Sequence, residues 1–176
     1  MQPQLSDNQT GHAIQSVRAT AGPAWFDYPI RVQPHHTDYG GIAWHGSYVA
    51  WMEEARVEYL RSLGMDFANL VALGCDLPVV DLSIRYHRSL PLGATAIVRT
   101  RMQNIDGVRL NWNYKIQPLD SDLDHSDLGR EAGAAGVYAS AQVSLVAVDR
   151  EKGKIMRQLP PEIKRVLMQL VGDVSS

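Results

Sequence analysis

The stretch "HHTDYGGIAWHGSYVAWMEEARVEYL", residues 35–60, places a turn directly before a long helix. Asp38, Gly40 and Gly41 are typical turn residues, because glycine tolerates positive φ and aspartate bonds to nearby backbone. Ser47 is expected to be the N-cap of the helix. Apolar residues then recur at the helical period over a wide face: Tyr48, Val49, Trp51, Met52, Ala55, Tyr59 and Leu60. This pattern predicts a helix that is wrapped by a sheet, with its end near Gly64.

The segments around this helix alternate between apolar and polar residues, as half-buried strands do. One such segment, residues 26–33, precedes the helix, and its Pro29 favours an edge strand. Four more follow at residues 80–87, 94–105, 108–117 and 137–148, with Asp106-Gly107 as a hairpin turn. Short helices are expected at residues 66–73 and 161–171.

This order of elements predicts an α+β fold, with one long helix against an antiparallel sheet of about five strands. The sheet would leave an unpaired edge, which favours a homodimer. We expect residues 1–24 to form a mobile arm and residues 25–176 a single domain. The acidic, Gly- and Ala-rich segment 118–136 is expected to be a surface loop.

The composition narrows the class of protein. With a net charge of −2, the chain lacks the basic excess of a nucleic-acid or membrane-surface binder. No run reaches the ~18 apolar residues of a membrane-spanning helix, and residues 1–24 lack the pattern of a secretory signal. Cys75 is the one cysteine, so no internal disulfide can form, and we expect it to be a buried apolar residue. Together these features predict a cytoplasmic protein.

Three interpretations of the turn at Asp38 compete. His35, His36, Asp38 and His45 have the side chains of a metal site, but neighbours on an extended segment point to opposite sides. A second interpretation is hydrolysis, in which Asp38 activates water or attacks directly while the helix N-terminus at His45 stabilises an oxyanion. The third is structural, with Asp38 capping a turn and His45 beginning a helix. Residue types and spacing alone leave all three open.

A resemblance favours the second interpretation. "HTDYGGIAWHGSYVAWMEEAR" resembles the signature of hotdog-fold acyl-CoA thioesterases, in particular the 4-hydroxybenzoyl-CoA and Tol-Pal-associated groups. The shared pattern falls on Asp38, Gly40 and Gly41, His45, Tyr48, and residues 53–56, and the likeness covers residues 26–150. It implies a hotdog fold, a homodimer or homotetramer, and hydrolysis of an acyl- or aroyl-CoA without cofactor or metal.

The same resemblance implies the roles of single residues. Asp38 would be the catalytic nucleophile or general base, and the backbone N–H of His45, or its imidazole, would act on the thioester carbonyl. Gly40, Gly41 and Tyr48 would contact substrate. One departure is Pro34, which stands where the Tol-Pal-associated group carries a tyrosine.

Further side chains are candidates beside those with an implied role. Arg85, His87 and Arg88 stand at the end of the strand at residues 80–87, where arginine is suited to the phosphates of coenzyme A, and a solvated strand end is the alternative interpretation. Glu53 is a possible second carboxylate, although a surface position paired with Arg56 is the simpler interpretation. A non-catalytic acyl-CoA-binding module on the same fold is the competing function, and the acyl group stays open between aromatic and fatty classes.

Overall fold

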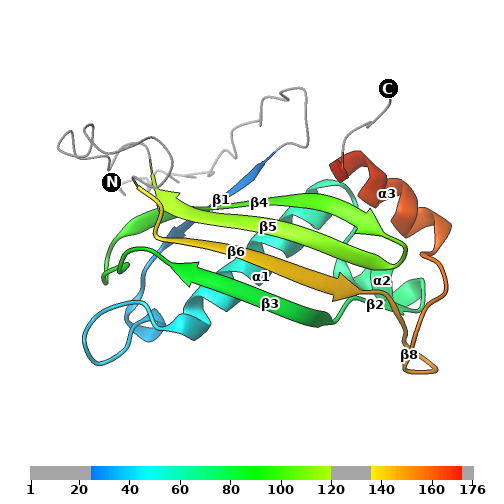
Figure 1. The fold of residues 1–176 in the computed structure, drawn as a ribbon, viewed down its shortest axis with the longest axis horizontal. Coiled ribbons are helices and arrows are strands. Elements are labelled where there is room, and N and C mark those ends of the chain that lie inside the picture. The colour runs from blue at the N-terminus through cyan, green and yellow to red at the C-terminus, as the bar shows by residue number, and fades with distance from the viewer. Residues whose placement is uncertain (1–24, 120–135, 172–176) are drawn as a thin grey trace, which may run out of the picture.

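The computed structural model describes residues 25–119 and 136–171 and has one antiparallel sheet wrapped around one long helix (Figure 1). The strand order is β1-β4-β5-β6-β3. The strands are β1 (Phe26–Arg31), β3 (Val79–Tyr86), β4 (Thr95–Asp106), β5 (Arg109–Pro118) and β6 (Ala139–Val146). The α+β class, the five strands and the edge position of the strand with Pro29 are confirmed.

Helix α1 (His45–Ser62) lies against the inner face of the sheet and supplies the centre of the core. Trp51 is only 2% exposed, and full burial of a large apolar side chain contributes roughly 1.5–3 kcal/mol. The inner face opposite it is built from the alternate residues of the central strands, including Val98, Met102, Leu110 and Trp112. The helix ends at Ser62 with Leu63 as its C-cap, and Gly64 follows with a φ of 77°, as expected.

Smaller elements close the ends of the sheet. A one-turn 3-10 helix, η1 (Pro34–His36), precedes α1, and α2 (Phe67–Ala72) follows it with Asp66 as N-cap. Helix α3 (Pro161–Val171) packs beside β4 through Ile163 and Leu167, which are buried. A separate small sheet, which the alternation pattern did not predict, joins β2 (Cys75–Asp76), β7 (Val148–Asp149) and β8 (Lys154–Ile155).

The start of α1 differs from the expectation. The N-cap is Trp44 and not Ser47, because the chain turns helical already at His45. The hydroxyl of Ser47 donates instead to the carbonyl oxygen of His36, at 2.8 Å, and ties the helix to η1. Val49, expected on the buried face, is 38% exposed.

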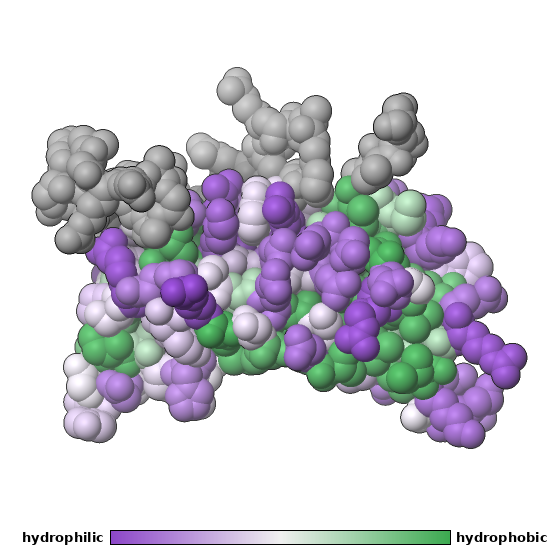
Figure 2. All heavy atoms as spheres, in the orientation of Figure 1, coloured by the Kyte–Doolittle hydropathy of each residue, from purple (hydrophilic) through white to green (hydrophobic). Residues whose placement is uncertain are grey.

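Strand β3 forms one border of the sheet, and among the described strands it pairs with β6 alone. It carries large apolar side chains that are 41–49% exposed: Val79, Val80, Leu82 and Tyr86. Hydrophobic atoms gather along the lower border of Figure 2, where β3 runs in Figure 1. No helix of the described part is long and apolar enough to cross a membrane. The expected arm, residues 1–24, and residues 120–135 of the expected loop lie outside the described residues.

Candidate active site

Asp38 sits in a tight turn that fixes its carboxylate. The backbone N–H groups of Gly40 and Ile42 both donate to Asp38 Oδ1, at 2.9 and 3.2 Å, which leaves Oδ2 available. Gly41 has a φ of 73°, a conformation that favours glycine. A Cβ at Gly40 would lie 3.2 Å from Asp38 Oδ1, so this position favours glycine by close approach. The two predicted glycines therefore shape the turn that presents the carboxylate.

The beginning of α1 lies next to this turn. Trp44 N–H donates to the carbonyl oxygen of His36, at 3.1 Å, and Ala43 pairs with Thr37 across a β-bridge. The N–H of His45 is the first of the helix and has no hydrogen-bond acceptor among the described residues. A free N–H at the positive end of an 18-residue helix attracts a negatively charged oxygen.

A cavity of about 610 Å³ lies between the Asp38 turn, the start of α1 and the segment after β3. Four residues singled out from the sequence line it together: Asp38, His45, Tyr48 and Arg88. His87, which the sequence also placed beside Arg88, lines the cavity as well, and the remaining lining residues were not predicted: Ile42, Ala43, Trp44, Tyr86 and Ser89. The segment after β3 reaches the site because Ile42 pairs with Pro91 and the N–H of Ala43 donates to the carbonyl oxygen of Leu90, at 2.9 Å, contacts that no sequence motif indicates.

Tyr48 closes the floor of this cavity. The side chain is buried, and its ring packs against Tyr86 with centroids 5.0 Å apart. Burial, with the neighbouring Tyr86 and Tyr138 as smaller causes, raises the pKa of Tyr48 to about 12. Its hydroxyl therefore stays protonated at neutral pH.

Trp44 forms another part of the wall and depends on a glycine. A Cβ at Gly46 would lie 2.1 Å from the Trp44 indole, so the ring folds over the helix start only because position 46 has no side chain. The indole is 45% exposed and stands beside the imidazole of His45, with centroids 5.0 Å apart. The cavity thus has an aromatic wall next to the first helical N–H.

His35 and His36 lie together, contrary to the expectation of opposite directions. Both belong to η1 and not to an extended segment, and their rings are 4.0 Å apart. The Nδ1 atom of His36 accepts from Gln33 N–H at 3.0 Å, and its ring meets Trp51 edge-on. Within residues 25–119 and 136–171, no group of three or more His, Cys, Asp and Glu residues is arranged to hold a metal ion.

Glu53 lies away from this cavity. It borders a small hollow between α1 and β3 and pairs with Arg56, with Oε2 3.6 Å from Nη2. The carboxylate is 63% exposed, whereas Arg56 is buried.

Comparison with known proteins identifies the class. The thioesterase-like superfamily matches residues 32–168, and the chain belongs to this family. It is 48% identical over 171 residues to a Synechocystis protein named "Putative esterase", across 96% of this chain and 95% of the relative. It is 29% identical over 138 residues to the acyl-CoA thioester hydrolase YbgC of Escherichia coli, across 78% of this chain and 92% of that protein.

The fold comparison agrees with the family. The crystal structure of a 1,4-dihydroxy-2-naphthoyl-CoA thioesterase from Synechocystis superposes with a TM-score of 0.67 at 22% identity, covering 84% of this chain and 98% of that chain. The hotdog fold and the thioesterase class implied by the sequence motif are therefore confirmed.

Proposed function

We propose that this chain hydrolyses an acyl- or aroyl-CoA thioester to the free acid and coenzyme A, in the cavity lined by Asp38 and His45. The observation that carries the proposal is the convergence of Asp38, His45, Tyr48 and Arg88 on one cavity. Acyl-CoA is the substrate class of a relative that aligns over most of this chain. We also propose a cytoplasmic location, as the sequence composition predicts.

Asp38 carries the chemical step in this proposal. Its Oδ1 is held by two backbone donors, so Oδ2 faces the reactants in a defined orientation. Oδ2 either attacks the thioester carbonyl carbon or takes a proton from the attacking water. Both routes require a carboxylate at this position.

The start of α1 polarises the carbonyl. The N–H of His45 donates to the thioester oxygen, and the helix dipole stabilises the negative charge that develops there. Removal of one such donor costs about 10²–10³ in rate in other acyl-transfer enzymes. Tyr48 lines the acyl side of the site, and Arg88 binds a coenzyme A phosphate at its mouth. Gly40 and Gly41, which do not line the cavity, act by shaping the turn that presents Asp38.

The exposed edge of β3 is suited to pairing with a second copy of this chain. Strand β3 offers an unpaired edge with exposed apolar side chains, which in isolation invites pairing with another chain. The Asp38 cavity includes Tyr86 from this strand, so a partner paired at β3 would lie beside the site. We propose a β3-paired homodimer, further assembled into a homotetramer, with the active site at the dimer interface.

Asp38→Asn tests the function directly. Coenzyme A release, followed with a thiol reagent over a panel of aromatic and straight-chain acyl-CoAs, is expected to fall by about 10²–10⁴-fold. Asp106→Asn, at the exposed end of β4 before the hairpin turn, is the matched control and retains wild-type turnover. Circular dichroism and size-exclusion chromatography verify that both variants fold and assemble alike.

Two outcomes contradict the proposal. Wild-type turnover in Asp38→Asn removes the assigned role of the carboxylate. Tight binding of acyl-CoA to the wild-type chain without any turnover identifies a binding module in place of an enzyme.

A further inference from the structure

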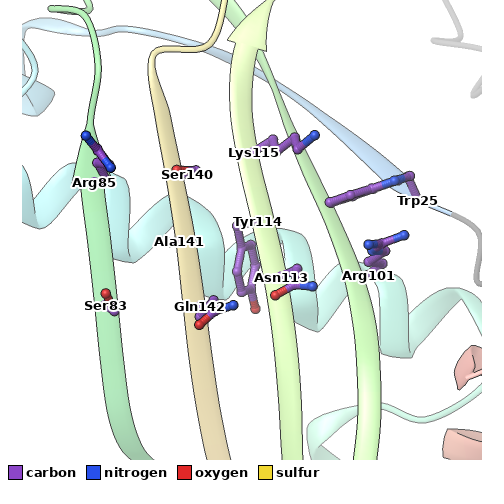
Figure 3. Close-up of a pocket in the computed structure, with 10 residues that line it drawn as sticks. All are labelled: Trp25, Ser83, Arg85, Arg101, Asn113, Tyr114, Lys115, Ser140, Ala141 and Gln142. Atoms are coloured by element: carbon purple, nitrogen blue, oxygen red, sulfur yellow. The ribbon is translucent and has the colours of Figure 1, made fainter. Parts of the chain in front are cut away.

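The outer face of the sheet, opposite α1, carries a second pocket that the thioester site does not use. It has a volume of about 350 Å³ and draws its residues from four strands and from Trp25, which precedes β1 (Figure 3). Hydrophilic residues cover the middle of this face in Figure 2. We call it the outer-face pocket. Its lining comprises Trp25, Ser83, Arg85, Arg101, Asn113, Tyr114, Lys115, Ser140, Ala141 and Gln142.

The strand register explains how these residues meet. Lys115 on β5 is opposite Ser140 on β6, which is opposite Arg85 on β3. The neighbouring row joins Arg101 on β4 to Asn113 on β5. Adjacent strands are about 4.8 Å apart, so three cationic side chains from different strands project over one small area. Figure 3 shows them on the side of the sheet that faces away from α1.

These three cations lack neutralising carboxylates. The lining residues include no aspartate or glutamate, and within the described part of the chain none lies within ion-pair distance of Arg85, Arg101 or Lys115. Arg99 provides the contrast on the same face, because it is paired with Asp27 at 2.7 Å. Three like charges over one pocket repel each other, and a multivalent anion between them relieves this repulsion.

Trp25 holds two of the three cations, Arg101 and Lys115, beside its ring. The Arg101 guanidinium lies over the Trp25 ring at 4.5 Å from its centroid, and Lys115 Nζ lies 5.6 Å from it. Arg101 Nε and Asn113 Oδ1 are buried without a hydrogen-bond partner in the structure. A buried donor without a partner is costly, which makes Arg101 Nε a position where a ligand oxygen is favourable.

We propose that the outer-face pocket binds the phosphoryl group of a small phosphorylated ligand, through Arg101, Lys115 and Arg85. Guanidinium groups match the geometry of phosphate oxygens, and a lysine adds a point charge. The hydroxyls of Ser83 and Ser140 supply additional donors at the rim. This site is separate from the proposed thioester chemistry, and its occupancy does not depend on Asp38.

Calorimetric titration of the full chain with pyrophosphate, at constant ionic strength, tests the proposal. Saturable binding at one site per chain is expected for the wild type and for Asp38→Asn. Arg101→Gln and Lys115→Gln each weaken it by about tenfold, the worth of one hydrogen bond to a charged group. Arg109→Gln is the matched control, since it removes a cation from the same face of β5, about 20 Å along the strand from Lys115 and outside the pocket lining. That variant binds like the wild type.

A second titration with ADP distinguishes the sources of the phosphoryl group. Equal affinities for ADP and pyrophosphate show that the pocket recognises the phosphoryl group alone. Tighter binding of ADP, lost in Trp25→Leu, shows that it recognises a nucleotide. The proposal is overturned if neither ligand binds, or if Arg109→Gln weakens binding as much as Lys115→Gln does, because the effect is then only that of net charge.

Discussion

The guanidinium of Arg56 donates a hydrogen bond of 2.9 Å to the hydroxyl of Tyr114, inside the core between α1 and β5. Both side chains are buried, and burial raises the pKa of Tyr114, so its hydroxyl stays protonated. Because Glu53 is largely exposed and 3.6 Å away, the phenol is the close partner that satisfies this buried cation.

Tyr114→Phe should therefore destabilise the fold. It leaves a buried charged donor without its acceptor, which costs about 1–3 kcal/mol. Urea denaturation followed by circular dichroism measures the difference. Tyr39→Phe is the control, because Tyr39 is fully exposed and the same change there should be neutral. Equal stability of Tyr114→Phe and wild type would show that Arg56 finds another acceptor.

His45→Pro separates the backbone from the side chain at the start of α1. Proline suits the first helical position, and Trp44 already has φ −75° and ψ 155°, which a following proline requires. The substitution removes the N–H and keeps the helix, so turnover should fall by about 10²–10³. His45→Ala, which removes the imidazole and keeps the N–H, should retain most activity. A larger loss of turnover in His45→Ala than in His45→Pro would show that the imidazole, and not the backbone N–H, acts on the carbonyl.

The fold could be predicted from the sequence because its signals are local. The period of Tyr48, Met52, Ala55 and Tyr59 marks the helix, and alternation marks the strands. The start of α1 was missed because Ser47 has the residue type of an N-cap. Its hydroxyl instead serves a contact with His36, which depends on tertiary structure.

The candidate site was predictable only in its local part. Asp38, the glycines and His45 lie on one short stretch, so a motif can hold them together. His87 and Ser89 join the cavity through tertiary contacts of their segment, such as the pairing of Ile42 with Pro91. No sequence motif predicts the outer-face pocket either. Arg85, Arg101 and Lys115 are far apart in the sequence and come together through the register of β3 to β6.

Cys75 should not interfere with an assay that detects the coenzyme A thiol. The side chain is fully buried, and burial, with Asp76 as a smaller cause, raises the pKa of its thiol. Native protein should react with a disulfide reagent about a hundredfold more slowly than a free thiol, since reaction requires local opening. In denaturant, one thiol per chain should react at once. Rapid reaction of the native chain would show that the small sheet containing β2 opens readily.

His36 should make stability depend on pH in the mildly acidic range. Burial, and secondarily the charge of His35, lowers the pKa of His36 below its usual value. As the pH falls through the usual histidine range near ~6.5, the unfolded chain takes up a proton before the folded chain does. Stability is therefore full above that range and is lost as the pH falls toward the lower folded pKa.

Urea midpoints at pH 7.5 and pH 5 measure this loss. His36→Asn keeps an acceptor for Gln33 N–H and removes the titrating ring, so its midpoint should change less between the two pH values than that of the wild type. His35→Asn removes only the smaller cause of the lowered His36 pKa, so its urea midpoint should change by an intermediate amount between the two pH values. If His36→Asn loses as much stability at pH 5 as the wild type, other groups carry the acid sensitivity. The packing of His36 against Trp51 would then not contribute to the pH dependence of stability.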